Sequence, residues 1–162
     1  MSTNPAKDFG AIADDYVFFE THATEPERDA QAYAKQLASF ASNGMIRVLD
    51  FGCGSGNFTM RVLNLLKWPP ERLQLTLVEP ADSVRQLAVE RLKKFTAAPI
   101  ANAAKLPTGL NGSFDLVLAN HVFYYVPDLV SHMRKLIDSL APSGVFLTAI
   151  AARSNALIEF WL

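Results

Sequence analysis

Residues 48–58 read VLDFGCGSGNF, and this stretch decides the fold. An apolar run ends at Asp50, a glycine-rich turn follows, and a helix is expected to begin near Asn57. Glycine suits such a turn because it accepts left-handed backbone angles and lets a ligand approach the main chain. Backbone N–H groups at the start of the helix favour a carboxylate or another anion. The stretch therefore predicts a ligand-binding unit of strand, turn and helix.

The rest of the chain repeats this alternation of strands and helices. Apolar runs predict five strands, at residues 45–50, 73–79, 99–101, 114–120 and 145–151. Helical periodicity lies between these runs and at residues 9–16 and 30–37. Thr24 and Glu27 predict a capping box, and the APSG stretch at residues 141–144 predicts a turn. The whole pattern predicts an α/β fold with a Rossmann-like, doubly wound, mostly parallel sheet, which binds its ligand at the carboxyl ends of the strands.

We expect a single domain over residues 1–162, with N-terminal helices at 6–41, a core at 45–151 and the start of a C-terminal helix at 153–162. The last residues, ALIEFWL at 156–162, would leave an apolar helix face uncovered. Such a face normally packs against something. We therefore expect either that the sequence is a fragment or that this segment packs on a partner, such as a second copy in a homodimer.

Composition narrows the class of partner. The net charge at pH 7 is −1, and the sequence lacks the clustered basic face that nucleic-acid binding requires. It shows neither a signal peptide nor an apolar stretch of the ~20 residues that a membrane span needs. Cys53 is the single cysteine, and with the three histidines it shows no metal-ligand spacing. We expect a cytoplasmic protein that binds a small molecule and neither nucleic acid, membrane nor metal.

A second acidic residue strengthens the ligand prediction. Glu79 ends the strand LTLVEP (75–80), where a carboxylate can accept hydrogen bonds from both ribose hydroxyls of an adenosyl ligand. A nicotinamide dinucleotide is the rival ligand, but its Gly-x-Gly-x-x-Gly pattern wants a glycine where Asn57 stands. Asp50 would also repel a pyrophosphate. A ligand with an amino group and a carboxylate fits better, and the methionine end of S-adenosylmethionine has both.

These stretches, together with FDLVLANHVFYYVPD (114–128) and LAPSGVFLTAI (140–150), resemble the motifs of class I S-adenosylmethionine-dependent methyltransferases. The resemblance implies that the glycine loop holds the methionine part, that Asn102 and Ala103 flank the adenine, and that Asn120 and His121 border the sulfonium. The full set of implied cofactor contacts is Tyr16, Asp50, Gly52, Cys53, Gly54, Gly56, Glu79, Pro80, Asn102, Ala103, Asn120 and His121. The family sheet has seven strands, so the last two are expected to be missing here.

A narrower resemblance concerns the substrate. The strings YV (16–17), HATE (22–25), VEP (78–80) and YYVPD (124–128) are similar to those of histamine N-methyltransferase. This resemblance implies that Glu25 contacts a cationic amine and that Tyr124 and Tyr125 line the substrate site. His121 is the candidate catalytic base. Alternatively, it lines the site and transfers no proton.

The sequence therefore predicts an enzyme that methylates a small molecule by in-line transfer, with an amine as the candidate substrate. Two alternatives stay open at this point. One is a cofactor-binding regulatory subunit or pseudo-enzyme, and the other is a nicotinamide-dependent oxidoreductase.

Overall fold

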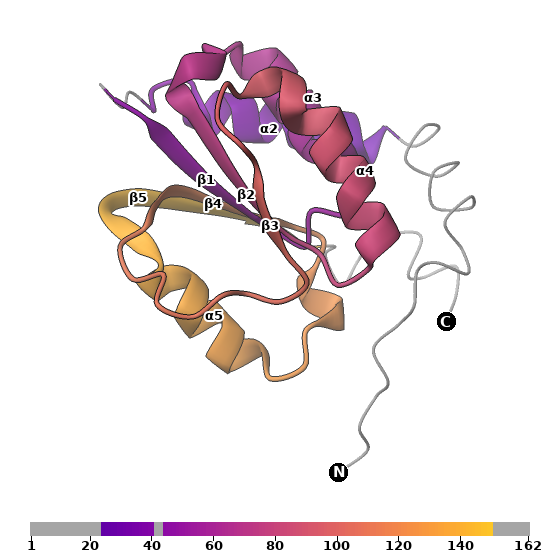
Figure 1. Cartoon of the computed structure of the whole chain (residues 1–162), viewed down its shortest axis with the longest axis vertical. Helices are drawn as coiled ribbons and strands as arrows, with labels where there is room; N and C mark the ends of the chain where they lie inside the picture. The colour runs from indigo at the N-terminus through magenta and orange to yellow at the C-terminus, as the bar shows by residue number, and fades with distance from the viewer. Residues whose placement is uncertain (1–23, 41–43, 151–162) are drawn as a thin grey trace.

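The computed structural model describes residues 24–40 and 44–150, which form one sheet with helices on both faces (Figure 1). The sheet has five strands in the order β3-β2-β1-β4-β5, and every neighbouring pair is parallel. The strands are β1 (Ile46–Phe51), β2 (Leu73–Val78), β3 (Ala101–Ala103), β4 (Phe114–Asn120) and β5 (Leu140–Ala149). The first strand, β1, thus lies in the middle of the sheet. Strands β2 and β3 follow on one side of it, and β4 and β5 lie on the other side.

In the described part of the chain, four α-helices cover the sheet. Helices α2, α3 and α4 lie on one face and α5 lies on the other (Figure 1). Their bounds are α2 (Glu25–Leu37), α3 (Asn57–Leu66), α4 (Asp82–Leu92) and α5 (Leu129–Asp138). Short 3-10 helices complete the described elements: η2 (Pro70–Arg72), η3 (Lys93–Phe95) and η4 (Phe123–Tyr125). Among residues 24–40 and 44–150, no helix has the length and apolar character to cross a bilayer.

The central strand β1 explains why the sheet is double-sided. Val48 and Leu49 are both almost fully buried, and because successive strand residues face opposite ways, each enters a different core cluster. Val48 packs in the cluster that includes residues of α2, α3 and α4, whereas Leu49 packs in the cluster with Leu136 of α5. Burial on both faces is typical of parallel strands covered by helices. The predicted fold class is confirmed, and the described part of the chain forms five strands where the family sheet has seven.

Three local predictions need correction. Thr24 is the N-cap of α2 but its side chain makes no capping bond, and Glu27 instead accepts from Gln31 and Arg61. The short strand lies at Ala101–Ala103 rather than at 99–101. The predicted turn at 141–144 falls inside β5, where the pairing with β4 shifts register. The predicted helix at 9–16 and the apolar segment at 153–162 lie outside the described residues.

Candidate functional site

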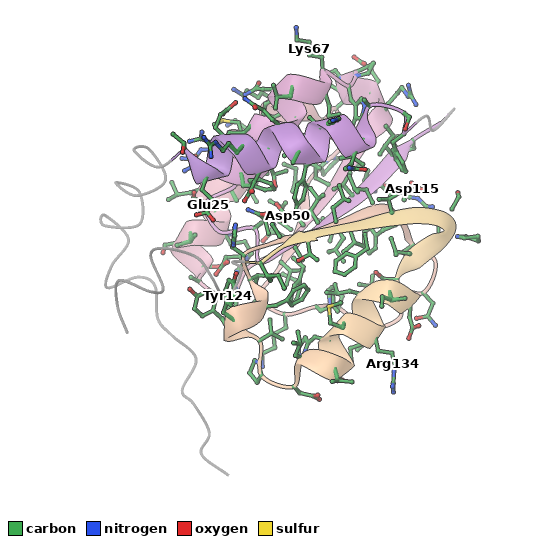
Figure 2. The ribbon with its side chains drawn as sticks, turned by 180° about the vertical axis from the view of Figure 1, so that it is seen from behind. Glu25, Asp50, Lys67, Asp115, Tyr124 and Arg134 are labelled. Carbon is green, nitrogen blue, oxygen red and sulfur yellow. The ribbon has the colours of Figure 1, made fainter. Side chains whose placement is uncertain are left out.

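The strand order reverses between β1 and β4, which is the topological switch point of the sheet. Open α/β sheets bind their ligands at the carboxyl ends of the strands at this point. Residues that follow the strands therefore gather at one end of the sheet. Figure 2 shows Glu25, Asp50 and Tyr124 near one another at this end, with Asp115 at the opposite end. The site is built here by four segments: the glycine loop after β1, the turn after β2, the end of β3 and the turn after β4.

The glycine loop needs its glycines for different reasons. Gly52, Gly54 and Gly56 all have positive φ angles, of 73°, 52° and 76°. A Cβ on Gly52 would lie 2.2 Å from Val122 Cγ2, and one on Gly56 would lie 3.1 Å from Ala88 on α4. A Cβ on Gly54 would meet nothing within 4 Å, so the loop is open at that point. Two glycines thus permit close packing of the loop, and the third has open space on the side where a side chain would lie.

Asp50, at the end of β1, is a buried carboxylate. Its side chain is 4% exposed and accepts a hydrogen bond from the Thr59 hydroxyl on α3. Burial raises the Asp50 pKa to about 7, the Thr59 bond opposes this rise, and the charge of Glu79 adds to it. A buried carboxylate without a countercharge is costly, so this position favours a cationic group beside it.

Glu79 follows β2, and its side chain contacts the glycine loop. Its Oε2 accepts from the Gly54 N–H at 3.2 Å, and its Oε1 accepts from the Ala81 N–H at 3.0 Å. Each carboxylate oxygen can accept a further bond, so the group can still receive donors such as ribose hydroxyls. Burial and the charges of Asp50 and Glu79 raise the pKa of the Cys53 thiol. Cys53 is therefore held as a neutral thiol and cannot act as a thiolate.

Arg85 on α4 connects the ends of β2 and β3. Its Nε donates to Asn102 Oδ1 at 3.1 Å, and its Nη1 donates to the Glu79 carbonyl at 2.6 Å. The Glu79 N–H in turn donates to the Ala103 carbonyl at 3.1 Å. The predicted ribose and adenine residues are thus joined into one hydrogen-bonded group by a buried arginine.

His121 follows β4 and meets helix α2. Its Nε2 lies 2.8 Å from Asp29 Oδ2 and 3.9 Å from Glu25 Oε1, and its Nδ1 lies 3.4 Å from the Tyr124 hydroxyl. The His121 and Tyr124 rings stack with their centroids 6.3 Å apart, and the Tyr125 ring packs edge-on against Tyr124. A φ of 51° at His121 turns the chain here, and its N–H donates to the Ala149 carbonyl. We call the side chains of Glu25, Asp29, His121 and Tyr124 the His121 cluster.

The glycine loop and the end of β4 each hold a buried polar atom with unmet hydrogen-bonding capacity. Asn120 Oδ1 and Ser55 Oγ are buried, and within residues 24–40 and 44–150 neither has a hydrogen-bond partner. Burial and the nearby charges of Asp29 and Asp50 raise the pKa of Tyr33. Buried polar groups are usually paired, so unpaired ones at a strand end indicate a place for a ligand.

The structure brings most of the predicted residues to this end of the sheet, and Tyr16 lies outside the described residues. Sequence reasoning missed Thr59, Arg85, Asp29 and Val122. Asp29 and His121 are 92 residues apart, and no local pattern could pair them. Among residues 24–40 and 44–150, no group of three or more His, Cys, Asp or Glu side chains could hold a metal ion.

Known proteins match most of this chain. The family model described as a methyltransferase domain matches residues 16–161. A trans-aconitate 2-methyltransferase from Rhodopseudomonas palustris (strain BisA53) is 38% identical, over 92% of this chain and 57% of its own length. A malonyl-[acyl-carrier protein] O-methyltransferase from Acetivibrio thermocellus is 28% identical, over 81% of this chain and 48% of its own length.

Solved structures agree on the fold. A Thermotoga maritima protein described as an S-adenosylmethionine-dependent methyltransferase and possible histamine N-methyltransferase superposes with a TM-score of 0.61. It is 20% identical, and the match covers 94% of this chain and 65% of that protein. The chain spans about half the length of the curated relatives it matches. On the family match, the fold and the glycine loop together, the chain belongs to the class I S-adenosylmethionine-dependent methyltransferases.

Proposed function

We propose that this chain forms a single S-adenosylmethionine-binding domain of an enzyme that methylates a small molecule. The observation that carries the proposal is the pair of carboxylates at the glycine loop: Asp50, buried at the end of β1 just before the loop, and Glu79, bonded to the Gly54 N–H. A cationic amine and a ribose in one ligand match a buried acid and a strand-end acid in one site.

Different residues of the site would bind different parts of the ligand. Asp50 would compensate the amino group, the open space beside Gly54 would take the methionine part, and Glu79 would accept from the ribose hydroxyls. The unpaired Asn120 carbonyl oxygen, which accepts, and the unpaired Ser55 hydroxyl, which donates and accepts, support a polar ligand beside them. The remaining cofactor contacts that the family resemblance implies are Tyr16, Gly52, Cys53, Gly56, Pro80, Asn102, Ala103 and His121. This arrangement gives the pyrophosphate of a dinucleotide an acidic neighbour, which argues against the oxidoreductase alternative.

The bound cofactor would supply an electrophilic methyl group on a sulfonium. The protein's part is alignment of the nucleophile and removal of its proton where it arrives protonated. His121 is the base that we propose, because its ring is held between Asp29 and the Tyr124 hydroxyl. One ring nitrogen bonded to a carboxylate orients the imidazole and sets which nitrogen carries the proton.

We further propose that the nucleophile is an amine. Both ion-pair partners of His121 are carboxylates, so the cluster carries net negative charge whether or not the imidazole is protonated. A cationic amine would be attracted to this cluster, and a carboxylate substrate would be repelled. The trans-aconitate relatives are named for an acid, so an amine substrate would mark a difference from them.

Calorimetric titration of the protein with S-adenosylhomocysteine tests the cofactor assignment. We expect binding, and we expect Glu79→Ala to weaken it by about 1–3 kcal/mol because the ribose hydroxyls lose their acceptor. Asp115→Asn is the matched control, because this acid lies at the opposite end of the sheet (Figure 2). Tight binding of NADH without binding of S-adenosylhomocysteine would reject the proposal.

A further inference from the structure

Arg85, the buried arginine of the site, bears on how the site recognises the purine base of the cofactor. The Arg85 side chain is 11% exposed and is bonded through all three of its nitrogens. Its Nε and Nη1 donate to Asn102 Oδ1 and to the Glu79 carbonyl, and its Nη2 pairs with the Asp82 carboxylate. A buried guanidinium that is bonded through each of its nitrogens is costly to rearrange. The partners of Arg85 are therefore held in place.

The Arg85 bond fixes the orientation of the Asn102 amide. An N–H donor can bond only to an acceptor, so the branch of the amide that meets Arg85 Nε must be the oxygen. The amino group, Nδ2, is then the other branch. Asn102 is exposed at the end of the sheet, so this amino group is available to a ligand. Asn102 therefore offers a donor where a carboxylate at the same place would offer an acceptor.

The strand order places Asn102 where the base would lie, a step that rests on the proposed function. The glycine loop follows β1, Glu79 follows β2, and Asn102 belongs to β3, which is the next strand in the sheet. A ligand with its methionine part on the loop and its ribose at Glu79 extends its base toward β3. The Glu79 N–H bond to the Ala103 carbonyl keeps these two strand ends together.

We propose that Arg85 and Asn102 make this site read the 6-position of the purine with an N–H donor. The 6-amino group of adenine is itself a donor, and the Asn102 oxygen that could accept from it is already bonded to the cationic Arg85, so Asn102 supports this group only weakly. A 6-oxo purine such as hypoxanthine has a carbonyl oxygen there, which accepts from Asn102 Nδ2. The site therefore accepts the 6-oxo analogue nearly as well as the adenosyl ligand. Sites that require a hydrogen bond from the amino group reject such an analogue by orders of magnitude.

The test is calorimetric titration of the intact protein with S-adenosylhomocysteine and with S-inosylhomocysteine. For the wild type we expect the two dissociation constants to differ by less than about tenfold. Asn102→Asp keeps the shape of the side chain and an acceptor for Arg85, but it turns the outward branch into an acceptor. We expect this variant to widen the preference for the adenosyl ligand by about tenfold, through loss of inosyl binding. Asn111→Asp adds the same charge in the exposed loop before β4 and should leave the ratio unchanged.

The outcomes separate the two proposals. Absence of S-adenosylhomocysteine binding to the wild type overturns the proposed function, and this inference with it. Binding of that ligand with a wild-type ratio of tenfold or more overturns the inference alone. A ratio that Asn102→Asp widens by threefold or less does the same. Because Asn102 is exposed, its replacement leaves the core intact, and thermal unfolding of each variant checks this.

Discussion

The Asp50 carboxylate is buried against the Thr59 hydroxyl, and this burial leaves it with a pKa of about 7. The ordinary value for an aspartate is near 4, so the folded chain binds a proton that the unfolded chain releases over this pH range. The contribution of Asp50 to stability is therefore greatest below about pH 4 and is lost as the pH rises toward 7. At neutral pH the ligand-free chain bears the cost of a buried charge. An amine beside Asp50 would offset that cost.

Replacement of Asp50 by Asn should therefore separate stability from binding. We compare the unfolding free energy of ligand-free Asp50→Asn with that of the ligand-free wild type at two pH values. Relative to the wild type, we expect the variant to be more stable at pH 8 than at pH 4, by up to roughly 4 kcal/mol. The same change should weaken S-adenosylhomocysteine binding at least tenfold, because the amino group loses its countercharge. Urea unfolding at the two pH values measures the first effect, and calorimetry measures the second. A variant that binds as well as the wild type would contradict the role given to Asp50.

Binding of the cofactor should depend on pH for the same reason. An ammonium group prefers the ionised form of Asp50, so protonation of this carboxyl competes with binding. We expect the affinity for S-adenosylhomocysteine to fall by up to about tenfold for each pH unit below 7. Calorimetry between pH 5 and 8 checks this slope. In Asp50→Asn the slope should be absent, and its persistence there would assign it to another group.

Two glycines of the loop are expected to differ in their roles: Gly52 in packing, and Gly54 in ligand binding. A Cβ on Gly52 would overlap Val122, so Gly52→Ala should destabilise the protein by about 3 kcal/mol, from the left-handed backbone and the clash together. Gly54→Ala has the backbone cost alone, about 1 kcal/mol, because open space surrounds that Cβ. We expect Gly54→Ala nonetheless to weaken S-adenosylhomocysteine binding at least tenfold, because the methyl group occupies the ligand's approach. Urea unfolding and calorimetry measure the two effects.

Gly109 supplies the matched control for this comparison. It has a φ of 73°, and a Cβ added there would meet no atom within 4 Å, but it lies in the loop between β3 and β4. Gly109→Ala should cost a similar amount of stability and leave binding unchanged. Equal effects of the changes at Gly54 and Gly109 on binding would argue against a ligand on the loop.

The Arg47–Asp115 pair joins β1 and β4 at the opposite end of the sheet. Asp115 accepts from the Arg47 backbone N–H at 2.8 Å and from two guanidinium nitrogens at 2.9 and 3.0 Å. These bonds lower the Asp115 pKa, so their contribution to stability is present above about pH 4 and is lost as the pH falls below it. We expect Asp115→Asn to cost about 1 kcal/mol at pH 7 and little at pH 3. Urea unfolding at both pH values measures this, and an equal cost at both would be the contrary result.

The features that depend on a local sequence pattern were predicted well from the sequence. The apolar run before Asp50 and the glycines after it marked β1 and the loop, and the strand-end position of Glu79 followed from the next apolar run. The capping box at Thr24 failed because Glu27 bonds to Gln31 and Arg61 instead of turning back.

What the sequence could not predict is contact between distant side chains. Arg85 reads as an ordinary charged residue of an amphipathic helix, yet it is buried between two strand ends. Asp29 reads as one acid among several in α2, and only the packing of α2 over the end of β4 brings it to His121. Such contacts depend on which helix covers which strand end, and no periodicity along the chain carries that information.

The His121 cluster gives the sharpest test of the substrate. Glu25 lies 3.9 Å from His121 Nε2 and is half-exposed, so it can turn toward a substrate without loss of core packing. If the nucleophile is an amine, Glu25→Gln removes an attractive charge and should raise KM about tenfold at unchanged affinity for S-adenosylhomocysteine. If the substrate is a carboxylic acid, the same change removes a repulsive charge and should lower KM. Transfer of a labelled methyl group to matched panels of amines and carboxylic acids gives the sign directly, with Glu27→Gln as the control from the same helix turn. A fall in KM for an acid would overturn the amine proposal and leave the cofactor assignment standing, because Asp50 and Glu79 are untouched by the change.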